Sequence, residues 1–168
     1  MSAKGFNIVE DGQIVTLYNP VDRNANGADS PVILLMENYT HASIIISYGA
    51  DPQIAGVITV ESIDDTAVST ATEINFRYYR YNTSQILANG DVPGALTWTT
   101  TAADGLIPTA AGVPIVYAIE LDAEELVPGD IGFRLCMVDP GAACVVGATA
   151  ILSGARYAKS STTQMAVV

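Results

Sequence analysis

The chain has 168 residues, of which 49% are hydrophobic and only 15% are charged, and its formal net charge is −11 at pH 7. An average soluble domain has roughly 25% charged residues, so we expect some apolar surface to be covered by partners. The 18 acidic and 7 basic residues exclude nucleic acid and anionic membranes as expected partners, because both bind through lysine and arginine.

Membrane insertion and export are not expected from the hydropathy of the chain. The longest apolar run, Val32 to Met36, is far shorter than the roughly 20 residues that a helix needs to cross a bilayer. The N-terminal residues Met1 to Phe6 do not open an apolar stretch of signal-peptide length. We therefore expect a protein that is made in the cytoplasm and kept there until it is assembled.

The first 30 residues differ in character from the remainder. Gly5–Glu10 and Gln13–Tyr18 predict two short strands around Asp11-Gly12, a tight-turn dipeptide. The stretch from Asn19 to Pro31 consists almost entirely of turn-forming residues. The sequence thus predicts an N-terminal arm over residues 1–30, with a short hairpin and a loop, that reaches a neighbouring subunit.

The segments that follow have the β-branched composition or the period-2 alternation of β-strands, separated by turn residues. Ile131–Val138 and Val145–Ser153 are expected to pair as a final hairpin, and Asp122 to cap a single helical turn. The pattern predicts an all-β antiparallel β-sandwich or jelly roll over residues 31–157, followed by a C-terminal tail over residues 158–168. The predicted strands are Val32–Glu37, Ala42–Tyr48, Ile54–Ser62, Thr72–Tyr81, Ala95–Thr101, Ile115–Asp122, Ile131–Val138 and Val145–Ser153.

The two cysteines, Cys136 and Cys144, flank the turn sequence Asp139-Pro140-Gly141-Ala142. A three-residue loop would place them opposite each other across a hairpin, whereas a loop of four or five residues would not. Because a reducing cytoplasm keeps thiols reduced, we expect free thiols, with a disulfide as the alternative.

Catalytic chemistry has little support in the sequence. A Ser-His-Asp arrangement would have to use His41, the single histidine, and the chain has no Gly-x-Ser-x-Gly motif. Glu120 and Asp122 lie two residues apart on a predicted strand and point the same way, which a solvated strand end explains without a glycosidase cleft. We predict a non-enzymatic protein with no catalytic residues.

A metal site is also not predicted. Asp22 to Gly27 matches the opening of a calcium-binding EF-hand loop. The twelfth position of that loop would be Ile33, where a bidentate glutamate is needed, and Pro31 interrupts the flanking helix. The chain has no cysteine and histidine cluster for zinc. We therefore expect neither a metal nor a cofactor.

The segment from Phe76 to Tyr81 is the most informative for binding. On a strand, one face would present Phe76, Tyr78 and Arg80, and the other would present Arg77, Tyr79 and Tyr81. Tyrosine and arginine often anchor protein interfaces. The alternative is a half-buried strand whose tyrosines reach water at their tips. The predicted protein-interface residues are Phe76, Tyr78, Tyr79, Arg80 and Tyr81.

Several segments resemble small structural proteins of tailed-bacteriophage virions. The first contains a Met-Glu-Asn-Tyr-Thr-His sequence, and the order of all segments agrees with those proteins. Together they cover most of residues 32–157, whereas residues 1–30 have no counterpart. The segments are Leu35–Ile46, Gly56–Glu61 followed by Phe76–Tyr79, Tyr117–Leu126 followed by Gly132–Leu135, and Ala150–Tyr157.

The resemblance implies a capsid cement or decoration protein, which binds the outer surface of the shell and clamps neighbouring subunits of the major capsid protein. It implies a homo-oligomer, either a dimer or a trimer, on the virion exterior after synthesis in the host cytoplasm. An acidic protein suits the outside of a shell better than packaged DNA. The alternatives are a tail-tube or head–tail joining subunit, and a carbohydrate-binding module on the virion that would use Trp98.

Overall fold

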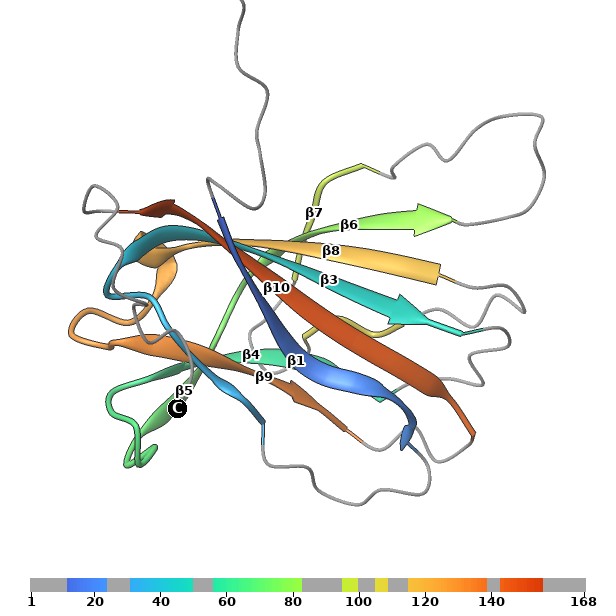
Figure 1. The fold of residues 1–168 in the computed structure, drawn as a ribbon, viewed down its shortest axis with the longest axis horizontal. Coiled ribbons are helices and arrows are strands. Elements are labelled where there is room, and N and C mark those ends of the chain that lie inside the picture. The colour runs from blue at the N-terminus through green and yellow to red at the C-terminus, as the bar shows by residue number, and fades with distance from the viewer. Residues whose placement is uncertain are drawn as a thin grey trace, which may run out of the picture.

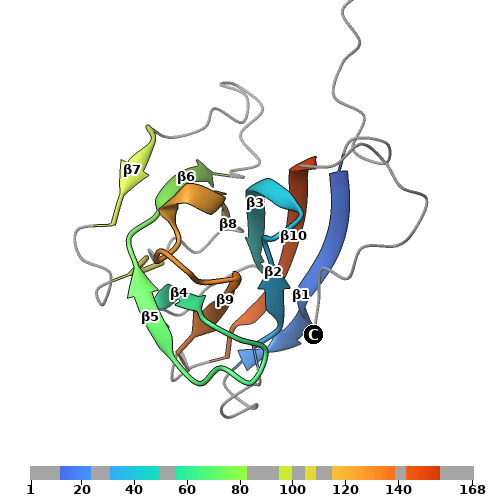
Figure 2. The ribbon, with the colours of Figure 1, turned by 90° about the vertical axis from the view of Figure 1, so that its left-hand side faces the viewer.

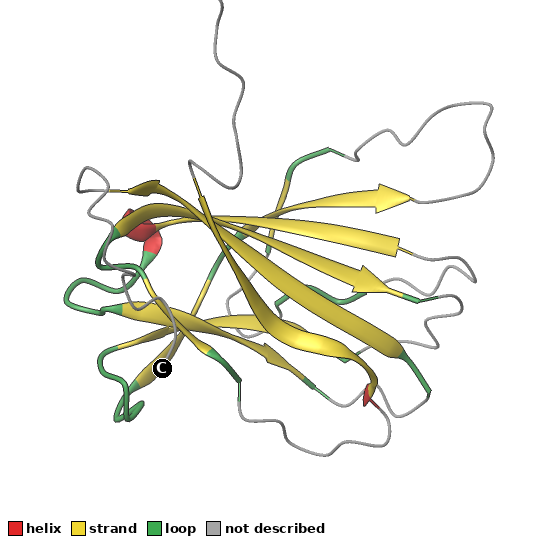
Figure 3. Cartoon of the chain, viewed as in Figure 1, coloured by secondary structure: helices red, strands yellow, loops and turns green. Residues whose placement is uncertain are grey.

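The computed structural model describes residues 12–23, 31–49, 56–82, 95–99, 105–108, 115–138 and 143–155. These residues form ten β-strands and one short 3-10 helix, η2, arranged as two antiparallel sheets that pack face to face (Figures 1 and 3). The predicted all-β sandwich is therefore confirmed. No helix within the described ranges has the length and apolar character needed to cross a membrane.

The larger sheet has six strands, with β3 and β8 at its centre and β1 and β7 at its edges. Every neighbouring pair is antiparallel. In spatial order the strands are β1 (Gly12–Asp22), β10 (Val145–Ala155), β3 (Tyr39–Tyr48), β8 (Ile115–Asp122), β6 (Arg77–Asn82) and β7 (Thr97–Trp98).

The smaller sheet has four strands and covers one face of the larger sheet (Figure 2). Its β2 and β9 approach each other so closely that a Cβ atom on Gly132 would lie 2.1 Å from the backbone oxygen of Leu34. Glycine is therefore required at this position. In spatial order the strands are β2 (Ile33–Leu35), β9 (Gly132–Met137), β4 (Ile58–Ile63) and β5 (Ala71–Ile74).

The core lies between the two sheets and is built by alternate residues of each strand. In β8 the burial alternates strictly over all eight residues from Ile115 to Asp122. Tyr18 spans the core, since its hydroxyl donates to the backbone oxygen of Leu135 at 2.5 Å, and burial raises the pKa of Tyr18 to about 12. Completely buried side chains from both sheets include Ile44, Ile46, Ile119, Phe76, Val60, Ile63 and Phe133.

The N-terminal prediction is wrong for Gly12–Asp22, which forms the edge strand β1 of the sandwich and not part of an arm. β1 pairs with β10 from Gly12 to Asp22, with two register shifts. The physical reason is burial of apolar side chains, because Val15, Leu17 and Tyr18 of β1 are buried and complete the core beside β10. Residues 1–11, where the other half of the predicted hairpin falls, lie outside the described ranges.

The predicted final hairpin is also wrong, because β9 and β10 belong to different sheets. Leu135 of β9 and Ala150 of β10 are both buried, and the two strands place these residues in the core from opposite sides. Cys136 and Cys144 are both free thiols, as expected. Burial raises the pKa of Cys136 to about 11, which leaves it protonated at neutral pH.

The single strand predicted over Thr72–Tyr81 is divided into β5 and β6, which lie in different sheets. The chain crosses between the sheets at Asn75 and Phe76. Thr99 holds this crossing, because its hydroxyl accepts from the Phe76 N–H at 3.2 Å and its own N–H donates to the Phe76 oxygen at 3.1 Å. The predicted helical turn after Asp122 is present as η2 (Ala123–Glu125).

Replacing Phe76 with alanine tests the position of this crossing. The side chain is completely buried, so Phe76→Ala should lower the free energy of unfolding by about 3–5 kcal/mol, measured by urea denaturation. The control Thr72→Ala removes an exposed side chain of β5 and should change it by less than about 0.5 kcal/mol. Equal effects of the two substitutions would contradict this placement of Phe76.

Candidate functional site

The outer face of the six-stranded sheet is the surface that faces away from the four-stranded sheet. Because strand residues alternate between faces, burial of Ala42, Ile44 and Ile46 in β3 turns His41, Ser43 and Ile45 outward. The same alternation places every second residue of β10, β8 and β6 on this face. Among the described residues, it is the broadest sheet surface without a covering layer (Figure 1).

One cross-strand row of the outer face runs across all six strands. Its members are direct partners in the antiparallel register from one edge of the sheet to the other. The row is apolar on the β1 side, charged in the middle and aromatic at the β7 edge. From β1 to β7 it consists of Ile14, Ile151, Ser43, Glu120, Arg77 and Trp98.

An ionic cluster occupies the end of the outer face where β3 begins and β8 ends. His41 lies between two carboxylates, with Nδ1 at 2.7 Å from Asp122 Oδ1 and Nε2 at 2.8 Å from Glu120 Oε2. Ser43 Oγ donates to the same Glu120 oxygen at 2.8 Å.

Arg77 extends the ionic cluster toward the β7 edge. Its Nη2 lies 2.7 Å from Asp122 Oδ2 and 3.3 Å from Glu125 Oε1. Glu125 Oε2 also accepts from the backbone N–H of Asp122 at 2.8 Å, which anchors η2 to the end of β8. The Arg77 guanidinium carbon lies 5.4 Å from the ring centroid of Trp98, within the range of a cation–π contact.

These contacts change the acidity of Asp122. The hydrogen bond from His41, together with that from Arg77, lowers the pKa of the Asp122 carboxyl despite partial burial. The same pairing raises the pKa of Arg77. The Asp122 carboxyl is therefore ionised at neutral pH and paired within the cluster.

The cluster contains the three residue types of a serine hydrolase but not their working arrangement. Ser43 Oγ is 3.2 Å from His41 Nε2, and His41 Nδ1 contacts Asp122. A general base must accept the serine proton at Nε2, yet Nε2 also faces Glu120 at 2.8 Å, and the Ser43 hydroxyl donates to Glu120 instead. The geometry therefore favours a structural ion network over nucleophilic catalysis.

An apolar stripe lies beside the ionic cluster on the same face. We use this name for Ile14, Ile45, Tyr79, Ala118 and Ile151. Ile45 pairs with Ala118, which pairs with Tyr79, while Ile14 pairs with Ile151 in the adjacent row. Ile14 is 54% exposed and Ile45 is 36% exposed. Large exposed apolar groups gathered on one face are typical of interaction surfaces.

The predicted interface residues fall into three groups. Phe76 is completely buried and offers no surface to a partner, so the prediction is wrong for this residue. Tyr78 points inward against the core, edge-on to the Tyr117 ring at 6.2 Å. Tyr79 lies on the outer face, where it stays a candidate. Arg80 and Tyr81 belong to β6, but their side chains are not among those described.

The EF-hand-like sequence, where no metal site was predicted, lies only partly within the described ranges. Asp22, the first residue of the EF-hand-like sequence, accepts from the backbone N–H of Cys144 through Oδ1 at 3.0 Å. The remaining residues 24–27 of that sequence lie outside the described ranges. Within those ranges, no three histidine, cysteine or carboxylate side chains gather as a metal site would require.

Sequence reasoning placed Glu120 and Asp122 on one face but did not connect them with His41 and Arg77. Asp122 lies 45 positions from Arg77 in the sequence, and Glu120 lies 79 positions from His41. Only the order of the strands in the sheet brings these residues together. Comparison of the chain with protein-family models, with curated proteins and with solved structures finds no match.

The lowered pKa of Asp122 predicts a specific dependence of stability on pH. A carboxyl whose pKa is lower in the folded than in the unfolded state stabilises the fold above its unfolded value, near 3.8. That contribution is lost as the pH falls through the folded value. Asp122→Asn should therefore lower the free energy of unfolding at pH 7 by about 1 kcal/mol or less, and the difference from the parent should shrink as the pH falls below 3.8.

Urea unfolding of both proteins from pH 7 to pH 2 measures this difference. Glu124→Gln is the matched control, because it neutralises an exposed carboxylate of the same 3-10 helix. A difference between parent and Asp122→Asn that is constant across the whole pH range would contradict an ionic role for Asp122.

Proposed function

We propose that the protein is a non-enzymatic structural component of a tailed-bacteriophage virion, a capsid cement or decoration protein that stabilises the major capsid shell from outside. In this role it would be made in the host cytoplasm and act on the virion exterior. The proposal is supported by the resemblance of several segments to such proteins, by the net charge of −11, and by the broad outer face of the six-stranded sheet.

The apolar stripe is the observation that carries the proposal. Exposed isoleucines on a sheet face lose contact with water when a partner covers them, which contributes roughly 25 cal/mol for each Å² of apolar surface buried. A stable interface needs well over about 1,000 Å² of buried area in total. The face of a six-stranded sheet is broad enough to form an interface of this size. Catalysis would instead require a cleft with convergent polar groups.

The charges indicate what the partner should present. The arginines with described side chains are all engaged within the fold: Arg77 with Asp122, Arg134 with Glu61 at 2.5 Å, and Arg23 buried over the Tyr18 ring at 4.0 Å. The surface therefore presents an excess of carboxylates. Charge complementarity favours a partner surface with lysine and arginine around an apolar centre. We propose that the major capsid protein provides it.

Self-association is part of the same proposal. Copies arranged as a dimer or trimer around a local symmetry axis of the shell would bind together, so weak individual contacts would add up to a high avidity. The alternative within the virion is a tail-tube or head–tail joining subunit. Rings or tubes formed by the purified protein under the electron microscope would favour that alternative.

The double substitution Ile45→Ser and Tyr79→Ser tests the interface. Both side chains lie on the outer face, so their loss should leave the core intact and weaken binding to the shell by about tenfold or more, as expected for central interface residues. The measurement is co-sedimentation with intact heads of the phage that encodes the chain, with the copy number determined relative to the major capsid protein.

The control is Val138→Ser, which replaces an apolar side chain that is 58% exposed, and so more exposed than Ile45, just beyond the end of β9 in the other sheet. It should leave binding unchanged. Binding of the double variant at the parental level would show that the stripe is not the contact surface. Hydrolysis of a simple ester by the purified protein, abolished by His41→Ala, would overturn the non-enzymatic proposal.

A carbohydrate-binding module is the second candidate, and Trp98 is the observation that favours it. Its side chain is 54% exposed at the β7 edge, and the Arg77 guanidinium, whose carbon lies 5.4 Å from the ring centroid, could hydrogen-bond a sugar stacked on the indole. Binding on a glycan array that is lost in Trp98→Ala would support this candidate. Uniform absence of glycan binding would leave the capsid proposal as the better one.

A further inference from the structure

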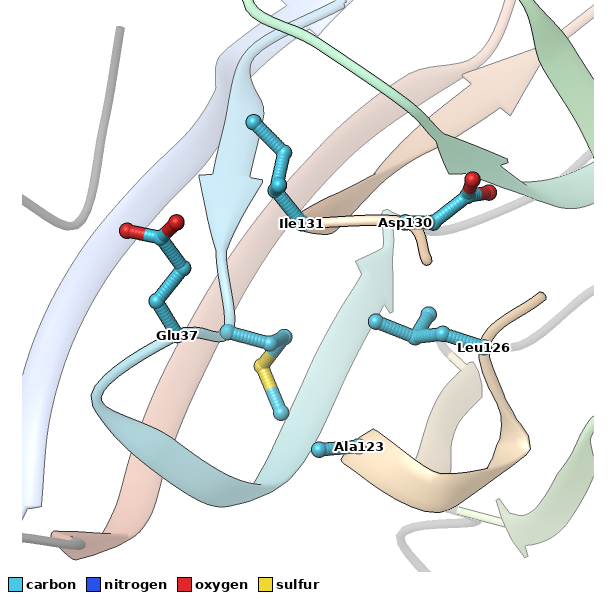
Figure 4. A pocket seen from close by; sticks show the side chains of 6 residues that line it. Glu37, Ala123, Leu126, Asp130 and Ile131 are labelled. Atoms are coloured by element: carbon cyan, nitrogen blue, oxygen red, sulfur yellow. The ribbon is translucent and has the colours of Figure 1, made fainter. Parts of the chain in front are cut away.

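A pocket of about 240 Å³ lies at one end of the sandwich, away from the outer face. It lies between the turn that joins β2 to β3 and the segment from η2 to the start of β9 (Figure 4). Its wall is partly apolar and partly acidic. The lining residues are Met36, Glu37, Ala123, Leu126, Asp130 and Ile131.

The apolar part of the pocket is rigidly built. Met36 and Leu126 are 2% and 8% exposed, respectively, and both pack in the core. The Met36 N–H donates to the Ile131 oxygen at 2.9 Å, and the Ile131 N–H donates to the Ile63 oxygen at 3.0 Å. These bonds tie three chain segments together, so the pocket is a preformed feature of the fold.

The rim of the pocket is negatively charged. Glu37 and Asp130 directly follow and precede the hydrogen-bonded pair Met36 and Ile131, and Figure 4 shows their carboxylates on opposite sides of the pocket. Asp130 Oδ2 accepts from Ser62 Oγ at 2.5 Å. No cation among the described residues forms an ion pair with either carboxylate. An apolar floor with an anionic rim matches a lysine side chain, which has an aliphatic stem and an ammonium head.

The surroundings strengthen the attraction for cations. The turns and strand ends at this end of the sandwich, which faces the viewer in Figure 2, are rich in carboxylates. Among the described residues there, Arg77 is the only lysine or arginine, and it is paired with Asp122 within the ionic cluster. The acidic residues are Glu37, Asp64, Asp65, Glu120, Asp122, Glu124, Glu125 and Asp130.

The chain itself contains a complementary segment. Residues 156–168 include Arg156 and Lys159 but no aspartate or glutamate, in a chain with a net charge of −11. This segment follows β10, whose last residue, Ala155, pairs with Tyr39. The Tyr39 N–H in turn donates to the oxygen of Met36 at 3.1 Å, so β10 ends beside the turn that forms one wall of the pocket.

We propose that the segment 156–168 docks on this pocket in the same chain, with Lys159 as the residue that pairs with the Glu37 carboxylate. Four extended residues span about 13–14 Å. This length would allow Lys159 to reach the turn at Glu37 from the end of β10. The inference does not depend on the proposed virion function.

The same chain is a better occupant than a second copy. Lys159 is joined to the end of β10 by only a few residues. Such a short connection gives an effective concentration at the pocket of roughly millimolar. A second copy would have to approach against the repulsion between two molecules that each carry a net charge of −11. Docking within one chain should therefore be independent of protein concentration.

Hydrogen exchange of the full chain, followed by mass spectrometry at low salt, tests the docking. In the parent, the amides of residues 157–162 should exchange about five- to tenfold more slowly than in an unstructured peptide of the same sequence. Glu37→Lys should abolish this protection, and so should Lys159→Glu, because each brings like charges together. The double variant, which restores opposite charges, should regain most of the protection.

Glu124→Lys is the matched control, because it makes the same charge change at the same end of the sandwich without lining the pocket. It should retain most of the protection. Three results would overturn the proposal: unprotected amides in the parent, equal effects of Glu37→Lys and Glu124→Lys, or a double variant that stays unprotected. Protection that increases with protein concentration would assign the pocket to a second copy instead.

Discussion

The antiparallel register between β3 and β8 is the constraint on which the core and the outer face both depend. It pairs the buried Ile44 with the buried Ile119, and one residue farther along it pairs Ser43 with Glu120 on the outer face. A slip of one residue would move every side chain of one strand to the other face. Burial of the isoleucines therefore also fixes the position of the ionic cluster.

The strand order explains why the acidic chain tolerates so many carboxylates near each other. β8 lies between β3 and β6, so Glu120 and Asp122 each have a neighbouring strand on both sides. His41 comes from one neighbour and Arg77 from the other, and Asp122 contacts both. The network thus offsets repulsion within the sheet, although pairs that are exposed to solvent contribute only modestly to stability.

Much of the fold could be predicted because most of its strands can be recognised from the residues of the strand itself. The apolar composition of Ile115–Asp122 and the β-branched run Ala42–Tyr48 predicted the two central strands. Local signals could not assign strands to sheets, so Thr72–Tyr81 was expected as one strand although its two halves pack on opposite sides of the core. The same limitation hid the contact between His41 and Asp122, since it depends on which strands are neighbours.

The outer face and the end pocket present different chemistry in different directions. The face combines an apolar stripe with an ionic cluster whose members are hydrogen-bonded to one another, and its excess of carboxylates would be paired by a cationic partner surface. The pocket keeps Glu37 and Asp130 without a cationic partner among the described residues. Burying unpaired carboxylates under an apolar partner would be unfavourable. The face therefore suits a large protein partner, whereas the pocket suits a single cationic side chain.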